Sequence, residues 1–301
     1  REAGPVRQRL MTTHPAATAS DLPVGLAAVL EEIACTVARA AGRLVVDERP
    51  ADLGVSSKSS ATDPVTVMDQ RSQELIIERL AAARPDDAVL GEEEGGSTGT
   101  SELTWVIDPI DGTVNYLYGI PAYAVSVAVV VGDPAVAGAW QPVAGAVLNP
   151  ESGELFHAHL GGGARLTTDA GTRTLRTTAA TDVAHALVGT GFGYAADLRR
   201  RQAELLVDLL PRVRDIRRHG GAALDLCGLA AGRLDAYYES ALNPWDRAAG
   251  ELVAREAGAV LGGPVGDVLT RDLVWGAAPG LAAQFGPLVR ELSARHVGSV
   301  D

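Results

Sequence analysis

Residues 105–113 read Trp-Val-Ile-Asp-Pro-Ile-Asp-Gly-Thr, and this stretch is the most informative one in the chain. The apolar residues ahead of Asp108 predict a buried strand, and Pro109 with Gly112 ends that strand in a tight loop. Ligand sites favour the carboxyl ends of strands in layered α/β folds. Two carboxylates, Asp108 and Asp111, followed by a Gly-Thr turn therefore predict a point that holds a metal ion and a phosphate.

Three further acidic side chains stand at the ends of predicted elements. Glu92 follows the apolar run 88–90, and Asp246 opens a helical segment with an apolar face. Asp69 forms a capping-box pattern with Thr66, which precedes another predicted helix. Carboxylates that are scattered in the sequence but placed at strand and helix ends suit a hard divalent ion, which takes oxygen ligands.

Each of these acidic residues also has an ordinary structural explanation. Asp111 could be a turn residue, and Glu92 could belong to a solvated acidic loop. Asp246 could be a helix-start carboxylate favoured by the helix dipole, and Asp69 could be no more than a cap. The combination favours a metal site, because four such coincidences rarely occur together.

A phosphatase of another kind can be set aside on spacing. Haloacid-dehalogenase-type enzymes carry Asp-x-Asp-Gly-Thr after a strand, with the first Asp as nucleophile and the second, two residues on, as acid/base. Here Asp108 and Asp111 are separated by two residues, one of them Pro109. We therefore interpret both carboxylates as metal ligands and expect water to be the nucleophile.

These residues together resemble the inositol monophosphatase family. Its two signatures appear at residues 105–115 and as Trp-Asp-Arg-Ala-Ala-Gly at residues 245–250. The likeness runs from about Leu22 to Ala283, and the chain is most similar to the actinobacterial inositol-1-monophosphatases. It includes these shorter stretches: Lys58-Ser59-Ser60, Asp69-Gln70, Gly91-Glu92-Glu93, residues 190–194, residues 222–227 and residues 235–239.

The resemblance implies a site for two to three magnesium ions. Glu92, Asp108 and the backbone carbonyl of Ile110 would hold the first ion, and Asp108, Asp111 and Asp246 would hold the second. A third, weaker ion would bind Glu92 and solvent. Bound cations would neutralise a site whose carboxylates otherwise repel a phosphate dianion. Monoester hydrolysis is so slow without a catalyst that the site must lower the barrier by on the order of 20 kcal/mol.

The resemblance also implies catalytic and substrate-binding roles. Thr113 and Glu92 would orient the attacking water, with Asp69 hydrogen-bonded to Thr113, and the amides of Gly112 and Thr113 would receive the phosphate. Glu239 and Asp111 would reach hydroxyls of the alcohol. The substrate-binding set is Asp111, Gly112, Thr113, Gly221, Ala222 and Glu239.

Composition limits the partners and the compartment. The 301-residue chain has a formal net charge of −12, which argues against a nucleic-acid partner and against anionic membrane surfaces. No stretch is long and apolar enough to span a membrane, and Cys35 and Cys227 offer no disulfide framework. We therefore expect a cytoplasmic protein that acts on a small phosphate monoester. The resemblance adds two expectations, a homodimer and membership of a lithium-sensitive family.

The chain is expected to have a weakly ordered extension at 1–20 and two halves, 21–170 and 171–301. The first half would be α+β and carry most metal ligands, and the second would be α/β and carry Asp246 and substrate contacts. The resemblance implies a layered αβαβα sandwich with the site between the halves. Periodicity predicts helices at 26–44 and 67–84 and strands at 125–131, 143–148, 154–159, 186–189, 213–217, 234–239 and 274–277.

The sequence leaves three functions open. The first is a magnesium-dependent phosphatase acting on myo-inositol 1-phosphate and related inositol or sugar monophosphates, with direct in-line attack by an activated water. The second keeps the fold but acts on histidinol phosphate, fructose 1,6-bisphosphate or a 3'-phosphonucleotide. Gly221, His219 and the segment 243–244 depart from the family pattern and bear on this choice. The third is a regulatory binding protein, which the intact acidic set disfavours.

Overall fold

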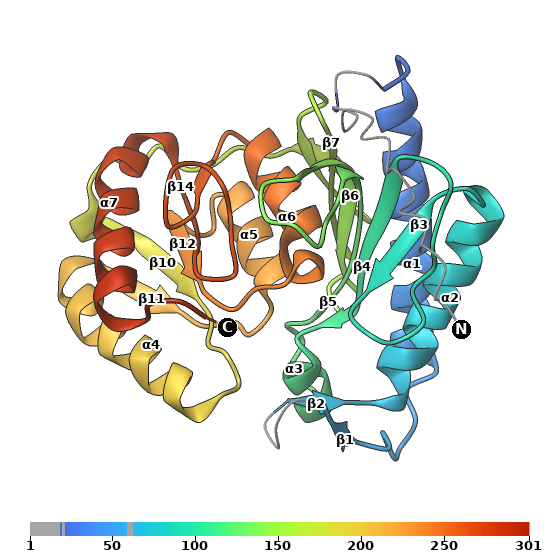
Figure 1. Cartoon of the computed structure of the whole chain (residues 1–301), viewed down its shortest axis with the longest axis horizontal. Helices are drawn as coiled ribbons and strands as arrows, with labels where there is room; N and C mark the ends of the chain where they lie inside the picture. The colour runs from blue at the N-terminus through green and yellow to red at the C-terminus, as the bar shows by residue number, and fades with distance from the viewer. Residues whose placement is uncertain (1–18, 20–21, 59–62, 301) are drawn as a thin grey trace, which may run out of the picture.

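The protein is built from five alternating layers of helices and sheets, as Figure 1 shows. Helices α1 (Leu26–Asp47) and α2 (Val67–Ala83) cover one face of a seven-stranded sheet. Helices α5 (Ala222–Ala230) and α6 (Pro244–Glu256) lie between this sheet and a five-stranded one. The outer face of the second sheet is covered by α4 (Ala196–Leu209) and α7 (Pro279–His296). The predicted αβαβα sandwich is confirmed.

The computed structural model describes residue 19 and the ranges 22–58 and 63–300. Apart from Ala19, the predicted N-terminal extension lies outside the described residues, as do Ser59 and Ser60 of the family-like stretch at Lys58. No helix within the described ranges is both long and apolar enough to cross a membrane.

The seven-stranded sheet has the order β3-β4-β5-β6-β7-β8-β9, so its strands follow the chain. Only β3 and β4 are parallel, and every other pair is antiparallel. Five predicted strands are confirmed in it: the run 88–90 as β3, the strand ahead of Asp108 as β4, and the strands at 125–131, 143–148 and 154–159 as β5, β6 and β7. The bounds are β3 (Ala88–Gly91), β4 (Leu103–Asp111), β5 (Ala124–Gly132), β6 (Trp140–Asn149), β7 (Glu154–His159), β8 (Ala164–Thr168) and β9 (Gly171–Thr174).

The five-stranded sheet has the order β11-β10-β12-β14-β13. Its middle strand, β12, is parallel to β10 and antiparallel to β14, so the direction of the strands reverses next to the centre of the sheet. The four predicted strands of this half are confirmed, whereas β13 was not predicted. The bounds are β10 (Leu187–Thr190), β11 (Asp215–Arg217), β12 (Ala236–Glu239), β13 (Val260–Gly262) and β14 (Val274–Ala277).

Short elements complete the described chain. Strands β1 (Ser56–Ser57) and β2 (Pro64–Val65) form a small antiparallel pair, and α3 (Thr113–Tyr118) follows β4 directly. Single 3₁₀ turns stand at 183–185 and 210–212. In Figure 1, α3 lies at the same end of the molecule as β1 and β2, below the space between the two sheets.

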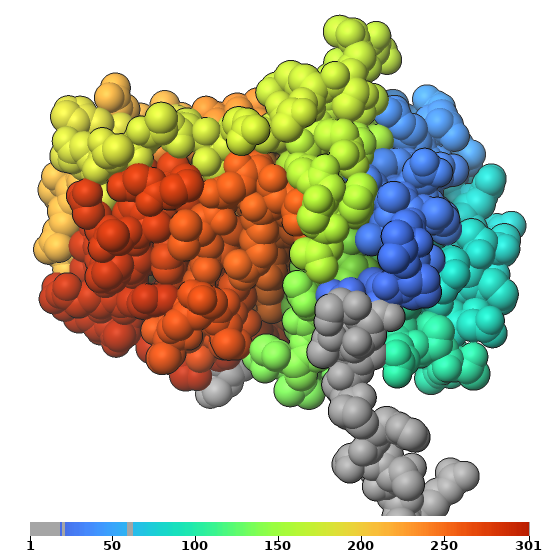
Figure 2. Space-filling view, turned by 90° about the horizontal axis from the view of Figure 1, so that it is seen from above, coloured from blue at the N-terminus to red at the C-terminus, as the bar shows by residue number. Residues whose placement is uncertain are grey.

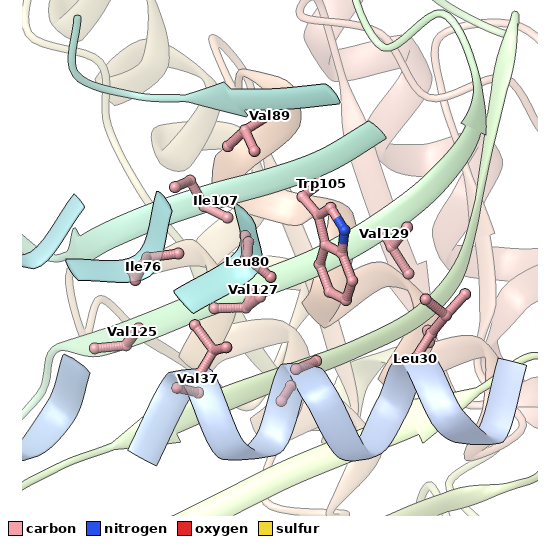
Figure 3. Close-up of a cluster of buried hydrophobic side chains, with 14 of the residues drawn as sticks. Leu30, Val37, Ile76, Leu80, Val89, Trp105, Ile107, Val125, Val127 and Val129 are labelled. Atoms are coloured by element: carbon pink, nitrogen blue, oxygen red, sulfur yellow. The ribbon is translucent and has the colours of Figure 1, made fainter. Parts of the chain in front are cut away.

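Strand β4 is buried on both faces, which explains its unbroken apolar run. Trp105 and Ile107 point toward α1 and α2, where Leu30 and Val37 of α1 meet them, as Figure 3 shows. Val106 points the other way, into the cluster formed with α5 and α6. Each such side chain stabilises the fold by roughly 1.5–3 kcal/mol on burial. This packing fixes the position of β4 and hence of the residues at its carboxyl end.

Helix α6 approaches the seven-stranded sheet closely. A Cβ placed on Gly145 of β6 would lie 3.2 Å from Ala249 of α6, so the contact depends on small residues at both positions. Figure 2 shows the two halves in contact along a broad face. The division into halves stays our proposal; β9 belongs with the first half because it pairs with β8.

Candidate metal and phosphate site

A cavity of about 470 Å³ opens between the two halves of the molecule. It is lined by residues of β4 and α3 from the first half and by the first turns of α5 and α6 from the second. Acidic side chains dominate its wall: Glu92, Asp108, Asp111, Asp225, Glu239 and Asp246. All four carboxylates that were predicted to bind metal therefore line this cavity, although they are far apart in the sequence.

The end of β4 places two of these carboxylates. The pairing of β4 with β5 shifts register between Asp108 and Asp111, so Pro109 and Ile110 form an irregular insertion in the strand. The amide of Ile110 donates to Asp108 Oδ1 at 3.0 Å, which closes this local turn. Irregularities of this kind redirect side chains, and here both carboxylates reach the cavity.

Asp69 and Thr113 meet beside the end of β4, as predicted. Thr113 Oγ1 lies 3.1 Å from both Asp69 Oδ1 and the carbonyl oxygen of Ile110. The capping box of α2 is also present, because Asp69 Oδ2 accepts the amide and the hydroxyl of Thr66 at 2.8 and 2.6 Å. Burial raises the pKa of Asp69, and the Thr66 bonds oppose that shift. Thr66 thus holds Oδ2 of Asp69, and Oδ1 of Asp69 contacts Thr113.

The Gly-Thr turn after β4 begins helix α3 at Thr113. Gly112 has φ of 92°, a left-handed conformation that favours glycine. A Cβ there would also lie 3.2 Å from the carbonyl oxygens of Ala122 and Gly220. Because the first amides of a helix have no acceptor within it, the amides at this turn are the available hydrogen-bond donors at this end of the cavity.

Asp111 is held by the second half of the molecule. Its carboxylate accepts the amides of Ala222 and Ala223, at 3.2 and 2.8 Å, from the first turn of α5. Gly221 leaves room for this contact, since a Cβ there would lie 3.0 Å from Asp111 Oδ2. Burial raises the pKa of Asp111 to about 7, although the two amides oppose the rise. Gly221 and Ala222 therefore support Asp111 directly.

Asp246 lies in the first turn of α6, as predicted, and comes from the opposite half to β4. Its Oδ2 accepts the amide of Asn243 at 2.6 Å. Burial raises the pKa of Asp246 well above its ordinary value, and Glu92 and Asp111 add to the rise. The pKa of Asp108 is raised in the same way by burial and then by Glu92, Asp111 and Asp246. These carboxylates therefore interact with one another.

Glu92 follows β3, as predicted, and carries a cationic partner. Lys58 Nζ lies 2.8 Å from Glu92 Oε1 and also bonds Glu93. Burial alone would lower the pKa of Lys58, but Glu92 and Glu93 raise it. Lys58 contacts only Oε1 of Glu92, so Glu92 could offer its Oε2 to a metal ion and keep this contact.

Glu239 stands at the end of β12, on the opposite side of the cavity from β4. The hydroxyl of Tyr237 donates to its Oε2 at 2.6 Å, and a Cβ at Gly191 would lie 2.1 Å from Oε1. Burial raises the pKa of Glu239 to about 8, with Asp225 and Asp111 contributing. A fixed, buried carboxyl at this place fits a contact to a hydroxyl of the substrate.

Although these carboxylates line one cavity, they are not arranged around a single point as metal ligands would be. Within 22–58 and 63–300, no three acidic, histidine or cysteine side chains converge into a formed metal-binding group. The reason lies in the contacts above: Lys58 draws Glu92, the α5 amides hold Asp111, and the Asn243 amide holds Asp246. The donor set, buried oxygen ligands without nitrogen or sulfur, fits a hard divalent cation.

The structure places His219 away from the cavity wall. Its Nδ1 lies 2.5 Å from Asp225 Oδ1, and this carboxylate raises the pKa of the histidine. Sequence reasoning left open whether His219 packs or contacts substrate, and in this structure it pairs with Asp225.

Several residues that sequence reasoning did not assign also line the cavity, among them Asp63, Tyr194, Arg218, Asp225 and Arg271. Tyr194 ends a family-like stretch, which was its only signal. Arg218 and Arg271 belong to no recognised sequence motif, and only the fold shows that they line the cavity.

Comparisons with known proteins agree with this geometry. A family model described as "Inositol monophosphatase family" matches residues 27–296. The chain belongs to the inositol monophosphatase family. Its members are phosphatases, generally metal-dependent, that act on small phosphate monoesters.

The chain is similar to several named members of the family. The inositol-1-monophosphatase SuhB of Mycobacterium tuberculosis is 53% identical over 213 residues, or 69% of this chain and 71% of that protein. The Nus factor SuhB of Escherichia coli is 37% identical over 272 residues, or 87% and 96%.

Solved structures show the same fold. M. tuberculosis SuhB superposes with a TM-score of 0.74 at 44% identity, covering 90% of this chain and 98% of that one. An inositol monophosphatase of Thermotoga maritima gives 0.75 at 25% identity, covering 88% and 98%.

Proposed function

We propose that the protein is a magnesium-dependent phosphomonoesterase that hydrolyses myo-inositol 1-phosphate and related inositol or sugar monophosphates by direct attack of water. The observation that carries this proposal is the cavity wall, where Asp108 and Asp111 are buried, Asp246 is half-buried, and all three have raised pKa values. Such carboxylates are costly to keep ionised without a cation. The names of the mycobacterial relatives support the substrate.

Two to three magnesium ions would be held by the residues that the resemblance indicates. Asp108 would bind both of the first two ions. Glu92 and the Ile110 carbonyl would complete the ligands of the first ion, and Asp111 and Asp246 would complete those of the second. When bound, magnesium neutralises the carboxylates, polarises the phosphoryl oxygens and lowers the pKa of water. Because Asp246 comes from α6, binding would also join the two halves of the molecule.

Thr113 and Asp69 are suited to orient the attacking water. If Thr113 donates its hydroxyl proton to Asp69 Oδ1, its oxygen remains an acceptor for a proton of that water. Asp69 cannot turn away, because Thr66 holds its other oxygen. With Glu92 as a second acceptor, these residues would fix the direction of attack.

The phosphate and the alcohol would bind at neighbouring parts of the cavity. The amides of Gly112 and Thr113 would hold phosphoryl oxygens without any change of protonation. Glu239, fixed by Tyr237, and Asp111 would accept or share hydroxyl protons of the alcohol. Gly221 and Ala222 would shape the space beside it. Family likeness also favours a homodimer and a cytoplasmic enzyme.

Two alternatives keep the fold. The same cavity could act on histidinol phosphate, fructose 1,6-bisphosphate or a 3'-phosphonucleotide, and the arginines at 218 and 271 belong to the surface that would decide this. A regulatory binding role is supported by the name Nus factor, which the E. coli relative carries. That role needs none of the cavity carboxylates.

The test is phosphate release from myo-inositol 1-phosphate, histidinol phosphate, fructose 1,6-bisphosphate and adenosine 3',5'-bisphosphate, with magnesium and with a chelator. We expect the inositol ester to be preferred and the chelator to abolish release. Preference for another ester would keep the mechanism and change the substrate. No release from any ester by folded, magnesium-loaded protein would contradict the proposal and favour the binding role.

A further inference from the structure

Helix α6 borders two cavities, and adjacent residues of its first turn, about 100° apart around the axis, line one each. Asp246 faces the cavity between the halves, whereas Arg247, the next residue, lines a separate cavity of about 490 Å³. The side chain of Arg247 is only 6% exposed. A guanidinium buried to this degree must be paired, and the identity of its partners shows what it holds in place.

Arg247 contacts three separate parts of the chain. Its Nη1 lies 2.5 Å from Glu251, one turn along α6, and its guanidinium carbon lies 4.5 Å from the ring centre of Trp140 at the start of β6. Its Nη2 donates to the carbonyl of Leu269, in the connection between β13 and β14, at 3.3 Å. Arg247 thus ties the first turn of α6 to both sheets.

The carboxylates of the cavity come from two different elements. Asp246 shares the cavity with Asp108 and Asp111. Asp246 belongs to α6, while the other two belong to β4, so the position of the helix sets how Asp246 lies relative to them. Metal ligands must be held within about 0.5 Å of their binding geometry, and supporting contacts provide this.

We infer that Arg247 is the positioning residue for Asp246, acting from another side of α6 through Trp140, Glu251 and Leu269. The inference rests on the proposed function, because it takes Asp246 as a metal ligand. Arginine suits the task, since its planar fork can stack on an indole and bond a carboxylate and a carbonyl together. Lysine could keep only the ion pair.

Arg255 provides a matched control on the same helix. Its Nε lies 3.1 Å from Glu251, so it shares the carboxylate with Arg247. It is 37% exposed, and its only polar contact within the described part of the chain is with Glu251. R255M and R247M therefore remove the same charge and disturb the same Glu251, but only R247M releases the first turn of α6.

The experiment measures Mn²⁺ binding by electron paramagnetic resonance without substrate, the magnesium concentration at half-maximal phosphate release, and thermal unfolding in chelator. We expect R247M to weaken Mn²⁺ binding and raise the magnesium midpoint about tenfold or more, with kcat at saturating magnesium changed much less. R247K should lie between R247M and wild type, and R255M should stay within about twofold of wild type.

A second variant separates positioning from general stability. R247M leaves the largely buried Glu251 with Arg255 as its remaining cationic partner, so R247M/E251Q should recover part of the unfolding temperature in chelator while keeping the weakened Mn²⁺ binding. The inference would be overturned if R247M or the double variant bound Mn²⁺ with wild-type affinity. It would also be overturned if R255M lost as much Mn²⁺ affinity as R247M. Absence of Mn²⁺ binding by the wild-type protein would instead contradict the proposed function.

Discussion

Two groups of buried carboxylates in this chain show opposite electrostatics. Glu31 of α1 is 5% exposed, and Asp108 of β4 is 1% exposed. Burial raises the pKa of both, but hydrogen bonds from His157, His159 and Arg165 lower the pKa of Glu31 to about 2. Asp108 has only other carboxylates as charged neighbours, so its pKa stays well above its ordinary value.

The difference lies in the partners and not in the depth of burial. Glu31 accepts His157 Nδ1 and His159 Nδ1, both at 2.6 Å, and so joins α1 to β7. It is a structural carboxylate whose cations belong to the chain. Within the described part of the chain, Asp108, Asp111 and Asp246 accept hydrogen bonds from backbone amides but from no cationic side chain, which is the arrangement expected of residues whose cation is a ligand. The predictions below test this contrast.

The largest effect is expected for D111N. Replacing one ligand oxygen by an amide weakens the second magnesium, and polarisation by a metal is worth several kcal/mol, so turnover should fall about a thousandfold. The fold should persist, because asparagine can still accept an amide of α5 in the way that Asp111 does. Phosphate release against magnesium concentration measures the effect. Normal turnover at ordinary magnesium would refute the role of Asp111.

The counterpart is E31Q, which should change stability and leave activity intact. Glutamine leaves Arg165 without its carboxylate, and the cost should be about 2 kcal/mol, below that of a fully buried pair because Arg165 partly reaches solvent. Urea unfolding gives the free energy, and the magnesium midpoint is the control. A shifted magnesium midpoint would show that the two groups are not independent.

The pH dependence of stability should separate the two groups. The pKa of Glu239 is raised from 4.5 to about 8, so its contribution is present below pH 4.5 and is lost as pH rises toward 8. Glu31 contributes above pH 4.5 and loses this only as pH falls toward 2. The unfolding temperature in chelator should therefore fall as the pH rises from about 5 to 8. A flat profile would contradict the raised pKa of Glu239, and E239Q should reduce the slope but not remove it, because the pKa values of Asp108, Asp111 and Asp246 are raised as well.

The smallest effect is expected for E239A. Removing this carboxyl should change the ratio of kcat/KM between esters by about tenfold, because a hydrogen bond to the alcohol is worth about 1.5 kcal/mol. The magnesium midpoint should change much less. Equal losses on every ester would assign Glu239 a structural role.

The sequence predicted the carboxylates Glu92, Asp108, Asp111 and Asp246 because each lies where an apolar strand ends or a helix begins. The strands around Val127 and the helix that begins before Asp246 also have clear periodicity, and the structure confirms them. Strand β13 was missed because three residues are too few for a pattern. The roles of the site residues remain predictions that the experiments above address.

Other features depend on contacts that no local pattern records. The support of Asp111 by the α5 amides joins residues more than a hundred positions apart. Arg247 stood inside a recognised signature, yet its stack on Trp140 follows only from the packing of α6 on β6. The pairing of Lys58 with Glu92 likewise depends on how two loops meet.

The most direct test of the contrast is calorimetric titration of the metal-free protein with magnesium near pH 7, in buffers of different ionisation enthalpy. Cavity carboxylates with raised pKa values must lose protons when a cation binds, so we predict saturable binding with proton release. D111N should release fewer protons, and E31Q should match wild type. Binding without proton release, or no magnesium binding at all, would contradict the account.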